Sequence, residues 1–255
     1  MLVDVNTYIG HWPFRRLRHN TAEALVRRLD AHDIDWAVVA SIHGIFYKNV
    51  QPANEELSEE TEPYRDRLLP FATLNPNYPG WEEDLRRCTG DLGLRGLRLY
   101  PQYHGYRLTD PSSLELIDAA TALGWAVQVP MRVVDRRQRH PWDVAADIPP
   151  ADFETVFRRC PRTRWMVLNG SGLDGARLPA DVQFLIEISR LTAVLQRTIP
   201  ALLNTAGPQH LAFGTGMPFK VADPALLKLD ILEAPKEIKD RIAWQNVAEM
   251  LELKL

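Results

Sequence analysis

The sequence contains little cysteine, no long apolar run and no excess of positive charge. Its two cysteines lack the spacing of a metal site, and two thiols in 255 residues argue against a disulfide framework. No run of about 18 apolar residues occurs, so we expect no membrane-spanning helix. A formal net charge of -3 argues against nucleic acid as the partner. We therefore predict a cytoplasmic protein that binds neither nucleic acid nor a membrane.

Two sequence signatures are also missing. No basic stretch followed by an apolar segment opens the chain, so we expect no secretory leader. No Gly-x-Gly-x-x-Gly follows an apolar run, which argues against a dinucleotide-binding sheet. What is present is an ordinary composition, with 45% hydrophobic and 25% charged residues, as is typical of a folded globular domain.

Short apolar runs alternate with helix-like stretches along the whole chain. Several runs, such as 36–41, are apolar on both faces, as parallel strands covered by helices are. Repeated strand–helix units favour a closed barrel over an open doubly wound sheet, and no break in composition marks a linker. We therefore predict an α/β fold, a TIM (β/α)8 barrel forming a single domain over residues 1–255. The expected strands are 2–6, 36–41, 68–74, 96–100, 125–129, 165–168, 184–188 and 211–213.

Polar residues collect where these strands end, which is where active sites form in such barrels. Arginine among them presents a planar fork suited to carboxylate or phosphate, so we expect a small anionic molecule as the partner. Polar residues at strand ends are also common in plain turns, so the collective pattern is better support than any single member. We predict that the ligand contacts Asn6, Tyr8, Arg98, Tyr100, Gln128, Arg132, Arg136 and Asn169, and that His11, Asp135 and Glu187 carry any acid–base chemistry.

Two basic stretches have a less specific interpretation. The run 15–19 (RRLRH) is expected at the surface, away from the site. The stretch 132–141 (RVVDRRQRHP) is either a solvated charged loop or a ligand clamp, and the sequence does not decide between them.

Five segments together resemble the amidohydrolase superfamily, within its amidohydrolase-related branch of barrel hydrolases and decarboxylases. They are VDVNTYIG at 3–10, GLRGLRLYPQYHGY at 93–106, WMVLNGSG at 165–172, LAFGTGMPF at 211–219 and QNVAEMLEL at 245–253. The resemblance runs nearly end to end, and it implies the same barrel fold.

The resemblance also implies a divalent metal, held by His-x-His after the first strand, a histidine after the sixth and an aspartate after the last. Those positions here are Asn6 and Tyr8, Asn169 and Gly216, and Gln128 lies nearest the fifth-strand histidine position. Neutral amides and a glycine are poor ligands for a catalytic zinc ion. We therefore predict that the metal is absent and that the protein has no cofactor.

Three functions remain open at this point. The first is a metal-independent hydrolase of lactone, ester or amide type, which needs a base and an oxyanion stabiliser. The second is a retired enzyme that binds a small anionic ligand. The third is a metal-dependent hydrolase or decarboxylase whose ligands have moved to other residues. We place the first ahead of the others and leave a homo-oligomer open. The relocated ligands would be His11, His43, His104 and Asp135.

Overall fold

All eight predicted strands are present in the computed structural model, which describes residues 1–254. They run parallel to one another, as expected for strands connected by helices. The observed ends lie within a few residues of the predicted ones. The strands are β1 (Val3–Ile9), β2 (Trp36–Ser41), β3 (Leu68–Pro70), β4 (Gly96–Arg98), β5 (Ala126–Pro130), β6 (Arg164–Leu168), β7 (Phe184–Glu187) and β8 (Leu211–Ala212).

Regular pairing divides the strands into two arcs, β1-β2-β3 and β4-β5-β6-β7-β8. Backbone hydrogen bonds join the two arcs at both junctions. Between β3 and β4, the Ala72 N–H donates to the Gly96 carbonyl at 2.8 Å. Between β8 and β1, the Val5 N–H donates to the Phe213 carbonyl at 3.1 Å. The sheet therefore closes into the predicted TIM barrel.

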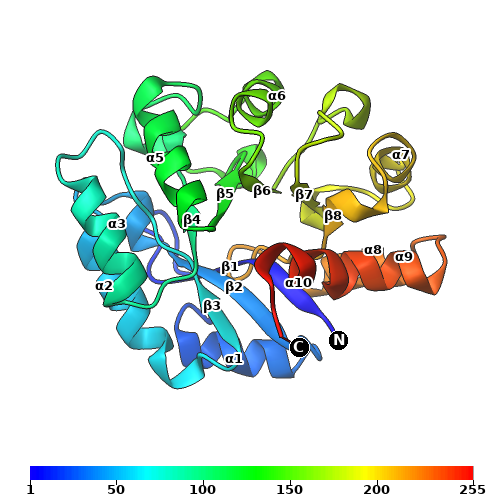
Figure 1. Cartoon of the computed structure of the whole chain (residues 1–255). Helices are drawn as coiled ribbons and strands as arrows, with labels where there is room; N and C mark the ends of the chain where they lie inside the picture. The colour runs from blue at the N-terminus through cyan, green and yellow to red at the C-terminus, as the bar shows by residue number, and fades with distance from the viewer. Residues whose placement is uncertain (255) are drawn as a thin grey trace.

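Helices surround the barrel (Figure 1). The first helix is capped by Thr21, whose side chain accepts a hydrogen bond from the Ala24 N–H. Within residues 1–254, every helix is too short or too polar to cross a lipid bilayer. The helices are α1 (Ala22–Asp30), α2 (Gln51–Thr61), α3 (Trp81–Gly90), α4 (Pro101–His104), α5 (Pro111–Ala122), α6 (Pro150–Arg159), α7 (Thr198–Thr205), α8 (Asp223–Asp230), α9 (Lys236–Asp240) and α10 (Asn246–Leu251), with a π-helical turn at Arg241–Gln245 before α10.

The N-terminal end of the barrel is apolar and closed. Val3 and Val5 of β1 pack with Phe71 and with strand residues from the other arc in a buried cluster. Helix α10, which crosses near the middle of the view in Figure 1, contributes Val247 and Met250 to the same cluster. Polar chemistry is therefore confined to the opposite end, where the strands finish.

Candidate functional site

A hydrogen-bonded network joins the ends of β1, β6 and β7. The buried carboxylate of Glu187 accepts from the Asn6 Nδ2 at 3.0 Å and from the Asn169 N–H at 3.1 Å. The Asn6 Nδ2 also lies 3.4 Å from the Asn169 Oδ1. Three residues predicted from separate strands thus meet at one place. Their convergence follows from parallel strands ending at the same edge of the barrel.

Lys220, which the sequence analysis did not single out, completes this network. Its Nζ donates to the Asn169 Oδ1 and to the Ser189 Oγ, both at 2.6 Å. The Ser189 Oγ in turn donates to the Glu187 Oε2 at 3.0 Å. Burial lowers the pKa of Lys220 to about 8, although the nearby Glu187 carboxylate opposes the shift. The feature of the sequence that could have identified Lys220 is its position, four residues after Gly216 in the segment that follows the last strand.

Two glycines after β8 make room for these side chains. A Cβ at Gly214 would lie 2.4 Å from the Glu187 Cγ and 3.1 Å from the Asn6 Cβ. A Cβ at Gly216 would lie 3.1 Å from the Lys220 Cδ and 3.3 Å from its Nζ. Gly216 also has a φ of +80°, which disfavours other residues. The segment G-T-G therefore permits the lysine to reach the strand ends.

Asp4 fastens β1 to the segment that follows β8. Its Oδ1 accepts from the Thr215 N–H at 3.0 Å and from the Asn6 N–H at 2.9 Å, and its Oδ2 accepts from the Thr215 Oγ1 at 2.5 Å. Burial raises the pKa of Asp4 to about 6, while the Thr215 hydrogen bonds act in the opposite direction. All of its partners belong to the barrel, so Asp4 has a structural role.

Arg98 and Gln128, predicted as ligand contacts, lie fully buried inside the barrel. The Arg98 Nε donates to the Gln128 Oε1 at 2.7 Å, and its Nη1 donates to the Thr7 carbonyl at 2.9 Å. The Tyr8 ring lies 4.7 Å from the Arg98 Cζ. The polar atoms of Arg98 and Gln128 form hydrogen bonds with each other and with backbone carbonyls of β1. The structure therefore gives no support to the prediction that these two residues contact a ligand. Tyr8 and Tyr100 are also buried, and their hydroxyls have no hydrogen-bond partner among the described residues.

Aromatic side chains from several loops pack around Tyr8 and Trp12. The Phe219 ring meets Tyr8 edge-on, with centroids 5.2 Å apart. Trp12 lies 5.0 Å from both Phe219 and Phe46 and 6.4 Å from Tyr103, measured between ring centroids. These rings therefore form one aromatic cluster with Tyr8.

The loop after β5 holds three more predicted residues. Arg132 and Arg136 both pair with Asp147, at 3.0 and 2.8 Å, and the Arg136 side chain is mostly exposed. Hydrogen bonds from Arg137, then from Arg190, hold the pKa of the Asp135 carboxyl well below its usual range. Asp135 is therefore poorly suited to the general-base role predicted for it, because a carboxylate of low pKa takes up protons weakly.

His11 lies apart from the network. It is exposed, its backbone N–H donates to the His43 Nε2 at 3.0 Å, and the two rings stack with centroids 5.8 Å apart. The His43 Nδ1 lies 2.7 Å from the Glu56 Oε2. Among the described residues, neither His11 nor His43 forms a hydrogen bond or ion pair with Glu187 or Lys220, so the structure gives the predicted catalytic role of His11 no support.

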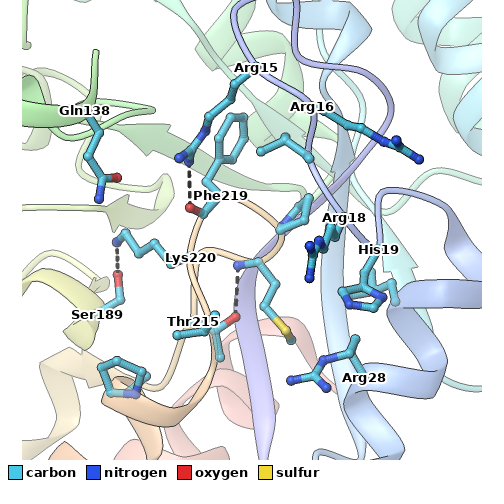
Figure 2. A pocket seen from close by; sticks show the side chains of 17 residues that line it. Arg15, Arg16, Arg18, His19, Arg28, Gln138, Ser189, Thr215, Phe219 and Lys220 are labelled. Atoms are coloured by element: carbon cyan, nitrogen blue, oxygen red, sulfur yellow. Dashed lines mark hydrogen bonds between the residues drawn. The ribbon is translucent and has the colours of Figure 1, made fainter.

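A pocket of about 680 Å³ opens beside Lys220 and Ser189 (Figure 2). The basic run 15–19, which was expected at the surface, is exposed except for Leu17 and also lines the wall of this pocket. Gln138, from the stretch 132–141, lines it as well. No acidic residue is among the described residues that line it. Its basic lining residues are Arg15, Arg16, Arg18, His19, Arg28 and Lys220.

Comparison with known proteins assigns this barrel to a family. A family model described as amidohydrolase matches residues 10–253. The chain belongs to the amidohydrolase family. A 2-amino-3-carboxymuconate-6-semialdehyde decarboxylase from Dictyostelium discoideum is 23% identical over 288 residues, covering 94% of this chain and 79% of that protein.

Solved structures of other amidohydrolase-type barrels share the fold. A 2,6-dihydroxybenzoate decarboxylase from Rhizobium is 18% identical, with a TM-score of 0.75 over 100% of this chain and 99% of the other. A dihydroxybenzoic acid decarboxylase from Polaromonas sp. JS666 is 15% identical, with a TM-score of 0.77 over 100% of this chain and 97% of the other. At these identities the likeness is one of fold.

The comparisons correct the prediction that the protein has no cofactor. The Polaromonas structure contains bound manganese and the inhibitor 2-nitroresorcinol. A 5-carboxyvanillate decarboxylase from Novosphingobium aromaticivorans likewise contains manganese. Members of the family thus use a divalent metal, and the expectation drawn from the replaced ligands is contradicted by this finding.

The side chains at the strand ends of this chain do not fit such an ion. Asn6 and Asn169 offer neutral amides and Gly216 offers no side chain. Within residues 1–254, no group of three or more His, Cys, Asp or Glu residues is placed to hold a metal. The Lys220 ammonium lies against the Asn169 Oδ1, where its charge would repel a divalent cation.

Proposed function

We propose that this protein decarboxylates a small organic carboxylate bound beside Lys220. The observation that carries the proposal is the Lys220 ammonium itself, which is held by Asn169 and Ser189 on the wall of a basic pocket. The names of the relatives support it, since the Dictyostelium, Rhizobium and Polaromonas proteins are all decarboxylases of small carboxylated compounds.

Decarboxylation places two demands on such a site. The bond between carbon and carboxylate breaks, its electron pair stays on the carbon, and carbon dioxide leaves. The carbon must then take a proton, and the best donor has a pKa near the working pH. Lys220, with its pKa near 8, is an ammonium at neutral pH and attracts the carboxylate before it donates. Water reprotonates the amine after product leaves.

Glu187 acts as a positioning residue in this proposal. No hydrogen bond links Glu187 to Lys220 within the described residues; the two are joined through Ser189, whose hydroxyl contacts both. Glu187 also accepts from Asn6 and from the Asn169 N–H. The carboxylate therefore fixes the two oxygens, on Ser189 and Asn169, that hold the ammonium.

Hydrolysis is a second candidate because of one distance. The Ser189 Oγ lies 2.6 Å from the Lys220 Nζ, as in serine–lysine pairs that perform acyl transfer. Neutral Lys220 would take the hydroxyl proton as the Ser189 Oγ attacks a carbonyl, and would return it to the leaving group. Water would then release the acid. This reaction needs the amine form, so it is favoured above pH 8, whereas decarboxylation is favoured below it.

The test measures products. Wild-type protein is incubated with 2,6-dihydroxybenzoate, 5-carboxyvanillate and aryl esters, with and without manganese, while carbon dioxide and free acid are quantified. We expect carbon dioxide release that declines above pH 8, loss of it in Lys220→Met, and retention in Lys236→Met, which changes an exposed lysine. Acid release that rises above pH 8 would favour hydrolysis. Binding of the acids without carbon dioxide release would contradict the proposal.

A further inference from the structure

The basic wall of the pocket carries positive charge that the protein does not neutralise. Within residues 1–254, Arg15, Arg16, Arg18 and Arg28 have no ion pair with any acidic side chain, although many other arginines of the chain do. No aspartate or glutamate is among the described lining residues. Like charges repel when they are gathered without a counter-charge, so the wall suits an anion.

The arginines approach the pocket in different ways (Figure 2). The Arg15 Nη2 donates to the Phe219 carbonyl at 2.9 Å, which holds its guanidinium over the pocket. Arg18 from the loop and Arg28 from α1 lie near His19 on one side of Thr215, whereas the Lys220 and Ser189 side chains lie on the other side. Arg16 points away from both groups.

We infer that Arg18 and Arg28 form a second oxyanion subsite, so that the natural ligand carries two anionic groups. The inference rests on the proposed function in placing the first group at Lys220. Met217 and Pro218 also line the pocket, and their apolar side chains would contact the carbon frame of the ligand. The geometry thus narrows the substrate class from any small carboxylate to a dianion.

The second group has two chemical sources. A carboxylate and a phosphate monoester each present two oxygens that can accept two parallel hydrogen bonds from one guanidinium. They differ in charge, because a phosphate monoester carries nearly two negative charges at neutral pH. A direct binding comparison can therefore tell them apart.

Isothermal titration calorimetry at low salt provides the test. Benzoate is compared with terephthalate, biphenyl-4,4′-dicarboxylate and 4-carboxyphenyl phosphate, which vary the spacing and the kind of second anion. For wild type we expect at least one dianion to bind about tenfold more tightly than benzoate, since charge-assisted hydrogen bonds add to the affinity. A larger gain for the phosphate than for either diacid would identify phosphate as the source.

Variants assign the gain to the subsite. The double variant Arg18→Gln/Arg28→Gln should lose the preference for dianions and keep its benzoate affinity, with an unchanged circular dichroism spectrum. Arg162→Gln is the matched control and should behave as wild type, because Arg162 is exposed and does not line the pocket. Equal affinity for all four ligands, or a preference that survives the double variant, would overturn the inference.

The same data separate this inference from the proposed function. Preference for dianions without carbon dioxide release from any of them would remove the proposed decarboxylation and leave the subsite in place. Carbon dioxide release from simple monoacids, with no preference for dianions, would do the reverse.

Discussion

Two buried or half-buried cations lie near the C-terminal ends of the strands, and they differ in what surrounds them. Arg98 is fully buried, and its guanidinium donates to Gln128 and to backbone carbonyls of β1. Lys220 donates only to the Asn169 and Ser189 side chains and lines an open pocket. The hydrogen bonds of Arg98 are made within the barrel, whereas Lys220 can also contact a ligand in the pocket.

The chemistry of the two side chains fits this division. A guanidinium stays protonated in proteins and suits a fixed interior role, because its several donors can all be satisfied at once. An ammonium responds to burial, and the pKa of Lys220 is lowered to about 8. Both side chains are positively charged, so their different roles follow from their positions: Arg98 lies inside the barrel and Lys220 lines the pocket.

The largest effect is expected from Lys220→Met. Under the proposed function, loss of the proton donor should lower the rate of carbon dioxide release about 10³-fold. The unfolding temperature should change little, because methionine relieves the burial of a charge while it removes two hydrogen bonds. Steady-state assays and thermal denaturation measure the two effects. A variant that keeps wild-type turnover would place the chemistry elsewhere.

Arg98→Met should have the opposite profile. Its removal leaves the Gln128 side chain and the Thr7 carbonyl without their donor inside the barrel, which should cost about 3–5 kcal/mol of unfolding free energy. Urea denaturation measures it. The exposed Arg162→Met is the control and should lie within about 0.5 kcal/mol of wild type. An equally small change in Arg98→Met would refute its structural role.

Asp4 extends the comparison to an enclosed anion. Its pKa of about 6 in the folded state lies above its ordinary value of 3.8, so the folded state binds the proton more tightly. The stability that this provides is present below pH 3.8 and is lost as the pH rises through 6. The unfolding free energy of wild type, relative to Asp4→Asn, should therefore fall by about 2–3 kcal/mol between pH 4 and 7.

Chemical denaturation at four pH values measures this difference. The exposed Asp181→Asn serves as the matched control for the loss of one carboxylate. A wild-type stability that rises relative to Asp4→Asn over the same pH range would contradict the sign of the shift.

Gly216→Ala should have the smallest effect on activity of the variants considered, and it should act through Lys220. Its Cβ would press on the Lys220 side chain, and its positive φ adds about 1–2 kcal/mol of strain. Gly80 also has a positive φ, of +89°, but a Cβ there meets nothing within 4 Å. We expect similar destabilisation in Gly216→Ala and Gly80→Ala, with about tenfold lower turnover in the first alone. Equal turnover in the two variants would show that a Cβ at position 216 does not disturb the function of Lys220.

The strands and part of the network could be predicted from the sequence. Apolar runs mark buried strands, and parallel strands in a barrel end at a common edge, so Asn6, Asn169 and Glu187 were expected near one another. What a strand-end position does not reveal is whether a side chain points into the barrel, as Arg98 does, or toward solvent. That choice depends on packing across the barrel.

Lys220 and the basic run 15–19 could not be predicted for a different reason. Both lie in loops, whose paths are set by contacts between distant segments, such as the hydrogen bond from Arg15 to the Phe219 carbonyl. No periodicity in the sequence carries that information. The prediction that the protein has no metal cofactor failed for a third reason. It was drawn from the residues at the ligand positions of this chain alone, and these do not show whether members of the family use a divalent metal.

The pKa of Lys220 tests the central claim most directly. Reductive methylation with 13C-formaldehyde gives each lysine a dimethylamine signal that can be titrated by NMR, and Lys220→Arg assigns the signal of interest. We expect a pKa near 8 that rises when terephthalate binds, because an adjacent anion favours the ammonium. A value near the ordinary 10.5 that does not respond to the diacid would contradict it.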